Sequence, residues 1–378
     1  MTSIYITPLL MMLSIIAFSP TRYYTFSSYA FIYALPGIIY CIIKYPSKIL
    51  WCLVALTVIS IFSGYDYHYN LYYFNERLTN FQIISSSCMW LVSYVTMKLA
   101  LQDKFTRKNE IPPFVILFYV IGILLMLDAL LREERSLLAG SNSGYYVLPI
   151  LPAVLYYFPK HKYKIIFLTF AICFLTIKRS TVIIMILSLI WLYVCYRKKI
   201  IRLSGRKKVR AFVVVIAIFV IVLTIGSVYL SSIVNRFSSI SEDGGSHRDL
   251  VYLASINIIH SFDLKQILFG CGPKYFWDCD QLVSSCHNDY LEIMISCGVF
   301  GLLIFIAIQC ILVKRLVLFA KEKNYMALLW GISCICFFIW NCLGSQFAYQ
   351  SGAIGICMFW AICDYELKKG KIVGGKHS

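Results

Sequence analysis

The chain has few charged residues, and acidic residues are especially scarce. Of its 378 residues 14% are charged and 60% are hydrophobic, and 18 Asp and Glu stand beside 35 Lys and Arg. A soluble globular domain is closer to one quarter charged, so the composition excludes an ordinary soluble protein. Repeated apolar runs, more than this average, predict an all-α polytopic membrane protein.

Several motifs of soluble enzymes and of transporters are missing. The sequence contains no GxxxxGKS/T loop, no GxGxxG after a strand, no nucleophile elbow, no CxxC and no Cys/His metal spacing. This disfavours transport driven by a nucleotide bound to this chain, and it suggests neither a cofactor nor a metal. Residues 1–19 lack a basic n-region and a small-residue cleavage motif, so we expect a retained first helix and not a signal peptide.

The apolar runs predict about twelve transmembrane helices. They cover 4–18, 28–43, 49–63, 81–101, 113–131, 145–158, 165–178, 180–196, 211–230, 289–313, 326–343 and 350–363. The segments 145–158 and 165–178 are shorter than the roughly 20 residues of a straight span. They must borrow flanking residues, thin the bilayer or break partway.

Basic residues predict the orientation in the membrane. The loop 197–210 holds eight Lys and Arg, so the positive-inside rule places it in the cytoplasm. Alternation then puts five further segments on that side: 44–48, 102–112, 159–164, 314–325 and 364–378. With Lys98, this side holds 25 of the 35 basic residues. Both termini are then cytoplasmic, and orientation explains the net charge of +17 without a nucleic-acid partner.

The opposite side carries one long loop, which we expect to be folded and partly helical. The predicted organisation is a nine-helix bundle (1–230), this periplasmic loop (231–288), and three helices with a cytoplasmic tail (289–378). The loop contains an amphipathic stretch (250–259) and Gly/Pro turns. A Tyr-rich segment at 64–80 is typical of an interfacial aromatic belt, with stacking on sugar rings as the alternative.

Basic residues at two places on the outer side could bind an anion. Lys178 and Arg179 lie in a tight turn on the outer side, where two adjacent cations oppose the positive-inside rule. Either their side chains snorkel to the interface, or they bind an anion such as phosphate, whose oxygens suit the guanidinium fork. Arg248 opens the amphipathic stretch. Its plain interpretation is a local ion pair, with Ser246 capping the helix.

The stretch "HNDYLEIMISCGVFG" (287–301) opens an apolar helix on polar residues. Asn288 is a good N-cap, and Asp289-x-x-Glu292 has capping-box spacing. Gly298 and Gly301 let helices pack closely. His287 precedes the cap, where the helix dipole favours the neutral imidazole that a general base needs. An ordinary loop histidine is the alternative.

Two further features of the outer loop stay open. Cys271, Cys279 and Cys286 share it, which permits at most one internal disulfide, and the pairing is not determined. Asp278-x-Asp280 has a spacing used to hold divalent metals, but two acidic residues in a loop are common by chance.

Three motifs in order resemble the bacterial O-antigen polymerase and O-antigen ligase superfamily. "HNDYLEIMISCGVFG" matches its signature of His, Asn/Ser/Gln, nine residues, then Gly-x-x-Gly. "SHRDLVYLASINIIHSFDLKQILFGCGPKYF" (246–276) is similar to its loop, with an Arg opening a helix and a Gly-x-Gly turn. "FLTIKRSTVIIMILSLI" (174–190) is similar to its helix with a Ser-Arg pair, here Lys178-Arg179. The resemblance covers 165–313 by motif.

The resemblance implies a fold like the type C glycosyltransferases and glycosyl transfer at the periplasmic face of the inner membrane. The donor would be a glycan on undecaprenyl pyrophosphate, without a nucleotide or a metal. Catalytic residues would be His287 as base, with Arg248 and Arg179 binding the pyrophosphate. Substrate-binding residues of second rank would be Lys178, Arg22, Arg132 and Arg135.

The particular reaction is less closely defined. A polymerase is favoured by the short length, aromatic-rich composition and divergent N-terminal half, and a ligase acting on lipid A-core is the alternative. A flippase or other transporter of lipid-linked oligosaccharide also has this many spans, but paired half-repeats are missing. Partners would be the lipid-linked oligosaccharide, the bilayer, a chain-length regulator and a flippase.

Overall fold

The computed structural model of the chain is helical almost throughout the part that it describes. The described residues are 7, 10–11, 20–65, 72–73, 76–102, 115–124, 147–174, 179–200, 244–279, 285–344 and 351–368. Within them the only strands are β1 (Tyr72–Tyr73) and β2 (Glu76–Arg77), which pair antiparallel. The predicted all-α class is confirmed for this part of the chain.

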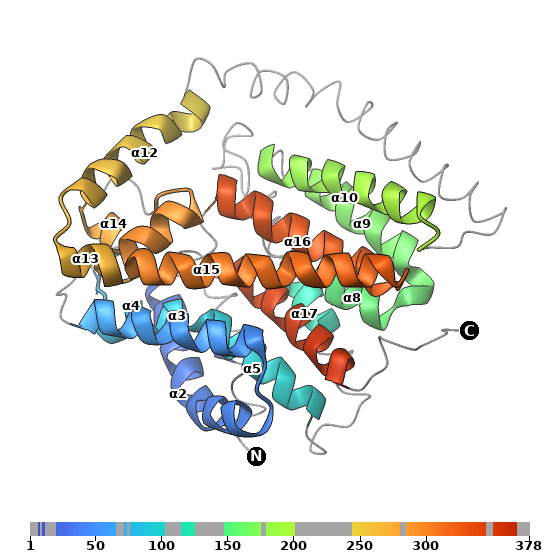
Figure 1. The fold of residues 1–378 in the computed structure, drawn as a ribbon, viewed down its shortest axis with the longest axis horizontal. Coiled ribbons are helices and arrows are strands. Elements are labelled where there is room, and N and C mark those ends of the chain that lie inside the picture. The colour runs from blue at the N-terminus through green and yellow to red at the C-terminus, as the bar shows by residue number, and fades with distance from the viewer. Residues whose placement is uncertain are drawn as a thin grey trace. The chain divides into compact units, whose positions relative to one another are not determined.

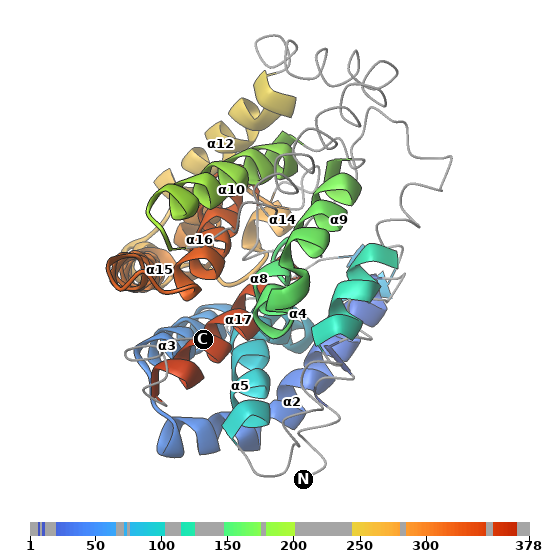
Figure 2. The same cartoon turned by 90° about the vertical axis from the view of Figure 1, so that its right-hand side faces the viewer.

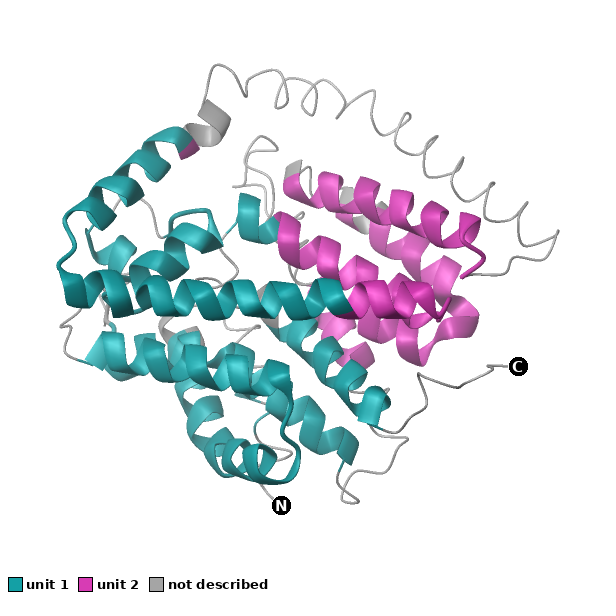
Figure 3. Cartoon of the chain, viewed as in Figure 1, with its two compact units in different colours: residues 1–111, 249–314, 340–378 teal, residues 112–248, 315–339 magenta. Residues whose placement is uncertain are grey.

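The chain forms two compact units, coloured separately in Figure 3. Unit 1 combines residues 1–111, 249–314 and 340–378, and unit 2 combines 112–248 and 315–339. Each unit is a set of helices that pack on one another. The predicted division at residues 230 and 288 concerns position in the membrane, and it stays a prediction.

Unit 1 holds most of the helices (Figure 1). They are α2 (Pro20–Lys44), α3 (Lys48–Tyr65), α4 (Asn80–Ser87), α5 (Met89–Gln102), α12 (Gly244–His260) from Asp249 on, α13 (Leu264–Phe269), α14 (Tyr275–Cys279), the larger part of α15 (Asp289–Lys321), and α17 (Ser351–Lys368). Capping boxes begin two of them: Thr79 with Gln82 for α4, and Asp263 with Gln266 for α13. These reciprocal bonds satisfy backbone N–H groups that a helix start leaves unpaired.

The segment predicted as one span at 81–101 is two helices, α4 and α5, bent by 53°. Ser86 and Ser87 hydroxyls donate to the carbonyls three residues earlier, at 2.7 and 2.6 Å, and the Cys88 thiol donates to the Ile84 carbonyl at 3.3 Å. Side chains that bond back to helix carbonyls bend the helix. The run "SSSC" therefore accounts for the break, which the apolar periodicity alone did not reveal.

α5 packs against both α2 and α17 in unit 1 (Figure 2). The rings of Trp90 and Trp360 lie 6.4 Å apart. Deeper along the same pair of helices, the Lys98 ammonium lies 3.6 Å from the Asp364 carboxylate, and both side chains are buried. The Tyr94 hydroxyl donates to Asp364 and accepts from Lys98 at 3.0 Å. A buried charge pair thus ties α5 to α17.

Asp364 lies just past the predicted end of the last span. The sequence places that end at 363 and a cytoplasmic tail from 364 on, and both stay predictions. The helix α17 continues to Lys368, and Asp364 is a buried residue within it. Its pairing with Lys98 stabilises a carboxylate that would otherwise be costly to bury.

Unit 2 is also built from apolar helices. They are α8 (Leu151–Tyr157), the 3-10 turn η1 (Pro159–His161), α9 (Lys162–Phe174), α10 (Arg179–Arg197), the segment Val115–Leu124, the end of α15, and most of α16 (Met326–Leu343). A Cβ at Gly331 would lie 1.9 Å from the Trp191 indole nitrogen, which donates to the Ala327 carbonyl at 3.1 Å. Glycine therefore lets α10 and α16 pack through this tryptophan.

Five helices of the described part are long and apolar enough to cross a membrane, or six if the bent pair α4 and α5 is one span. They are Tyr24–Lys44, Lys48–Tyr65, Ser180–Arg197, Asp289–Lys321 and Met326–Leu343. Apolar side chains such as Ile43, Ile190 and Leu303 are exposed on them, as expected for surfaces that face lipid. The chain is a multi-pass membrane protein.

The count of twelve spans and the type C fold remain predictions. Segment 211–230 lies outside the described residues, and so does almost all of 4–18. α8 has 7 residues and ends before Phe158, while residues 175–178 of the second predicted segment lie outside the described residues. α12 begins at Gly244, before Ser246, so the expectation that Ser246 caps this helix is wrong.

Candidate active site

The polar start of α15 is an N-cap made by Asn288. The Asn288 side-chain oxygen accepts from the backbone N–H groups of Tyr290 at 2.9 Å and Leu291 at 3.3 Å. The predicted N-cap is therefore confirmed. The expected capping box differs, because the Glu292 carboxylate accepts from the N–H of Cys286 at 3.0 Å. Glu292 thus holds the residue immediately before His287.

His287 lies between these two anchors in an unusual backbone conformation. Its φ is +51°, the left-handed region that few residues other than glycine adopt. Such a conformation costs about 1–3 kcal/mol and persists only where the surroundings enforce it. Asn288 holds the chain on one side and Glu292, through Cys286, on the other. The half-buried imidazole is therefore presented from a fixed loop at the positive end of a helix.

α15 is broken further along its length, at Gly298. This residue has φ +64° and ψ −165°, so the helical hydrogen-bond ladder is interrupted there. The carbonyls of Ile295 and Ser296 find other donors. The Cys271 N–H donates to Ile295 at 2.8 Å and the Gly272 N–H to Ser296 at 3.0 Å. The Ser63 hydroxyl of α3 also donates to Ser296, at 2.9 Å. The break is thus a docking point for α3 and for the loop that contains Cys271 and Gly272.

The two glycine motifs of the sequence meet at this break. A Cβ at Gly298 would lie 2.5 Å from backbone atoms of Leu268 and Phe269, and one at Gly270 would lie 2.4 Å from the Cys297 nitrogen. Gly270 has a φ of +79°, and Gly272, two residues later in the same turn, has a φ of +97°. Gly-x-Gly and Gly-x-x-Gly therefore form one backbone-to-backbone contact.

Gly301 has a different part in the same break. A Cβ there would lie 2.2 Å from the Cβ of Cys297 in the preceding turn. The break at Gly298 turns Cys297 toward this position, so only a residue without a side chain fits. The sequence predicted helix packing for both glycines. Gly298 instead receives a loop, and Gly301 accommodates the bend of its own helix.

α12 packs its inner face on the start of α15. Val251 of α12 belongs to a buried apolar cluster with Cys286 and Ile295. Ser255, one turn after Val251, is also buried and forms a hydrogen bond with the Cys286 thiol. Burial raises the pKa of this thiol, and the charge of Glu292 raises it further. Arg248 lies one turn before Val251, on the same side of the helix. Arg248 is the last residue of its segment of unit 2, and its predicted anion-binding role stays a prediction.

Lys274 is a member of this site that the sequence analysis missed. Its side chain is 3% exposed, and its φ of +66° again lies in the left-handed region. Burial lowers its pKa from 10.5 to about 8, while the charges of Glu292 and Asp289 act to raise it. Both carboxylates are themselves buried. A lysine after Gly-Pro in a polar loop gives no signal of burial, so periodicity could not have found it.

The remaining predicted residues are located only in part. Arg179 is the first residue of α10 in unit 2, and Arg22 lies in the first turn of α2; only their backbones are described. Lys178, Arg132 and Arg135 lie outside the described residues, as does Asp280. The roles predicted for these residues stay predictions.

The three loop cysteines are all free thiols in the structure. Cys271 and Cys286 are buried and Cys279 is exposed. Burial raises the pKa of Cys271 to about 12, which keeps this thiol protonated and unreactive at neutral pH. The loop is therefore held by hydrogen bonds and packing in this structure.

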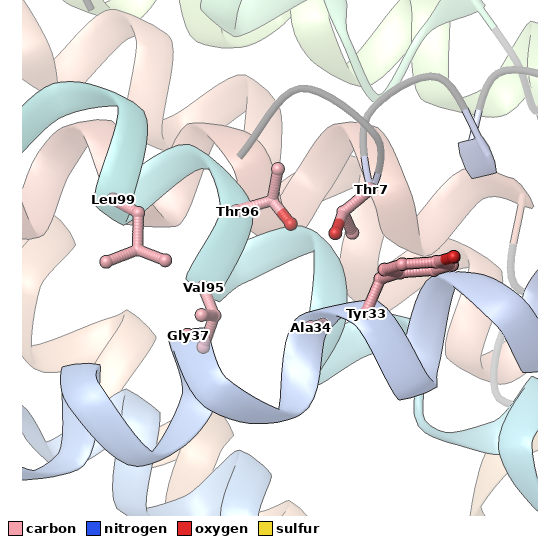
Figure 4. A pocket seen from close by; sticks show the side chains of 7 residues that line it. All are labelled: Thr7, Tyr33, Ala34, Gly37, Val95, Thr96 and Leu99. Atoms are coloured by element: carbon pink, nitrogen blue, oxygen red, sulfur yellow. The ribbon is translucent and has the colours of Figure 1, made fainter. Parts of the chain in front are cut away.

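A small pocket lies elsewhere in unit 1, between α2 and α5 (Figure 4). Its lining comes from Tyr33, Ala34 and Gly37 of α2, from Val95, Thr96 and Leu99 of α5, and from Thr7. The cavity volume is about 10 Å³, which is room for about one water molecule. It includes none of the predicted site residues and is too small for a sugar.

The fold and the site define a class: a multi-pass helical membrane protein in which short helices dock on a broken span beside a histidine. Residues 165–306 match the sequence model of a family described as O-Antigen ligase. This segment, less than half of the chain, is therefore similar to that family, in agreement with the resemblance of its motifs. A comparison with curated proteins finds no match to this chain.

Proposed function

We propose that this protein is an O-antigen polymerase, a glycosyltransferase of the bacterial inner membrane that acts at the periplasmic face. The observation that carries the proposal is the family match over 165–306, which includes Arg179, Arg248 and His287. The multi-pass helical architecture supports it, because a lipid-linked glycan is a substrate that stays in the membrane. Both termini would lie in the cytoplasm, as the basic loops predict.

The reaction transfers a growing glycan from undecaprenyl pyrophosphate onto a lipid-linked repeat unit. The bond between the anomeric carbon and the pyrophosphate oxygen breaks, and the pyrophosphate leaves with the electron pair. The acceptor hydroxyl oxygen forms a new bond to the same carbon and loses its proton. Because pyrophosphate is a good leaving group, the enzyme mainly has to position the acceptor, take this proton and stabilise the developing charge.

His287 would take the proton from the acceptor hydroxyl. Asn288 already caps α15, so the helix start does not need the imidazole. The positive end of the helix disfavours a protonated imidazole, which leaves the neutral form required of a general base. The enforced backbone conformation of His287 fits a side chain that must be held in one direction.

Arg248 and Arg179 would bind the pyrophosphate. Guanidinium groups match phosphate oxygens with two hydrogen bonds and remain charged throughout the reaction. Lys178, Arg22, Arg132 and Arg135 would add weaker contacts to phosphate or sugar. In this proposal the transfer needs no metal and no nucleotide cofactor. A flippase would deliver the substrate and a chain-length regulator would set the product length.

A ligase is the second candidate, since the matched family is described by that activity. A ligase would use the same residues but would transfer the finished glycan to lipid A-core. The two reactions differ in the acceptor whose hydroxyl group His287 would deprotonate, so the proposed residues would serve either reaction.

The test is complementation of a strain that lacks its polymerase and carries the cognate repeat-unit pathway. Wild type should restore long-chain surface polysaccharide, while His287→Ala and Arg248→Ala, at equal membrane levels, should leave single repeat units on lipid A-core. If the parent strain also carries single repeat units on lipid A-core, another protein must provide the ligase activity. Loss of all glycan from lipid A-core in the parent strain would instead identify a ligase. Full chain length in both variants would contradict the site assignment, and accumulation of substrate on the cytoplasmic side would indicate a flippase.

A further inference from the structure

A buried face of α15 carries two carboxylates directly beneath the His287 loop. Asp289, Glu292 and Ser296 are three or four residues apart, so they share one side of the helix. All three are almost fully buried. A helix N-terminus favours negative charge, but two buried carboxylates at this position still need a positive partner.

The loop that supplies this partner runs along the same face. Gly272 donates its N–H to the Ser296 carbonyl at 3.0 Å. Lys274 follows two residues later; its side chain is buried, and its ammonium lies 5.8 Å from the Trp277 ring centre. Glu292 and Asp289 both interact electrostatically with Lys274. The ammonium therefore balances buried carboxylates of α15.

Glu292 connects this cluster to the backbone of the His287 loop. Its carboxylate accepts from the Cys286 N–H at 3.0 Å, and His287 is the next residue. Lys274 and His287 are both non-glycine residues in the left-handed region. Each of the two loops that interact with the Glu292 carboxylate therefore contains a residue with a strained backbone.

We propose that Lys274 is a positioning residue, which holds Glu292 against the Cys286 N–H and so fixes the direction of His287. The inference rests on the proposed function for the role of His287. It adds a residue that does not touch substrate but acts through Glu292. The geometry assigns the same linkage whether the acceptor is a repeat unit or lipid A-core.

The variants that test it are Lys274→Met, Glu292→Gln and their combination. Lys274→Met keeps the length and packing of the side chain but leaves the buried Glu292 carboxylate without its counter-charge. The glutamine of Glu292→Gln still offers an oxygen to the Cys286 N–H and needs no ammonium. Lys265→Met is the matched control, because Lys265 is an exposed lysine of the same loop.

Two measurements are made on the full-length protein in membranes. The first is the length of surface polysaccharide in the complementation strain, normalised to protein level. The second is labelling of the buried Cys286 thiol by a membrane-impermeant maleimide, in a background where the exposed Cys279, Cys310 and Cys342 are changed to serine. The second measurement reports loop geometry and does not depend on activity.

We expect Lys274→Met to raise the rate of Cys286 labelling by roughly tenfold or more, since a buried pair broken on one side is strongly destabilising. Long-chain polysaccharide should be lost in parallel. Adding Glu292→Gln should recover part of the loss in both measurements, the coupling expected of interacting residues, while the Asp289 carboxylate stays buried without the ammonium. Lys265→Met should change neither.

Unchanged labelling in Lys274→Met overturns the proposal, and so does a double variant that behaves no better than Lys274→Met. Should Lys274→Met fail to accumulate, the double variant must restore its level, or the proposal is wrong. If labelling responds as expected while His287→Ala retains full chain length, the linkage stands and the proposed function fails. The two failures are therefore distinguishable.

Discussion

Gly270 and Gly298 occupy facing turns, each where the other segment leaves no room for a side chain. Gly270 meets the backbone of residues 296–297, and Gly298 meets that of residues 268–269, with 2.4 to 2.5 Å to the positions where a Cβ would stand. Both have positive φ. This contact joins the outer loop to the broken span and fixes the frame from which His287 is presented.

Replacing either glycine by alanine should destabilise the protein strongly. The positive φ alone costs about 1 kcal/mol or more, and the backbone clash adds to it because neither partner is a flexible side chain. We expect Gly298→Ala and Gly270→Ala to lower the thermal unfolding temperature in detergent and the membrane level. Gly37→Ala is the control, since its Cβ would meet only side-chain tips of α5, the nearest on Leu99. Equal effects at all three positions would argue against the contact.

The cap of α15 should be separable from catalysis. Asn288→Ala removes the oxygen that accepts from Tyr290 and Leu291, at a cost of about 1 kcal/mol. Asn288→Ser keeps an N-cap oxygen and should retain most of the stability. We expect chain length in the complementation strain to follow protein level in both variants. A normal level of Asn288→Ser with no product would show that Asn288 also acts on substrate.

The buried pair of α5 and α17 should tolerate removal of both charges better than removal of one. Lys98→Met leaves Asp364 buried without its ammonium and should cost on the order of 3–5 kcal/mol. Lys98→Met with Asp364→Asn removes the uncompensated charge, and the Tyr94 hydroxyl still finds an acceptor. Thermal unfolding in detergent measures both. A double variant as unstable as the single one would show that the pair contributes little beyond packing.

Lys274 should make stability depend on pH. Its folded-state pKa is about 8, below the ordinary 10.5, chiefly through burial. As pH rises from about 8 to 10.5, the folded chain has released this proton while the unfolded chain still binds it, so the free energy of unfolding increases. Below about pH 8 both states are protonated and the contribution is constant. Thermal unfolding across this range should show a slope that Lys274→Met reduces and Lys265→Met keeps.

Arg248 should not be replaceable by lysine. Lysine keeps the charge but loses the two-pronged geometry that matches phosphate oxygens, so Arg248→Lys should lose most long-chain product at an unchanged protein level. Arg197→Lys is the control, at an exposed position at the end of α10. Full activity of Arg248→Lys would show that only the positive charge of Arg248 matters, and not its two-pronged hydrogen bonding.

The sequence by itself determined the class of fold, the N-cap at Asn288 and the glycine positions, because each follows from local chemistry. Apolar runs of span length can be buried only in helices within a membrane. An Asn before an apolar helix satisfies the first N–H groups wherever the helix lies. The same local logic placed Gly270 and Gly272 in a turn, and both have positive φ.

Tertiary structure decided what each of these residues contacts. Gly298 contacts the backbone of a loop and not another helix. Lys274 is buried although it belongs to a polar loop. Asp364 is buried beside Lys98, which lies on a helix far away in the sequence. No local pattern encodes such pairings, since they depend on which surfaces meet after the helices have formed. A buried charge is stable only where its partner is brought to it, and that depends on the packing of the whole unit.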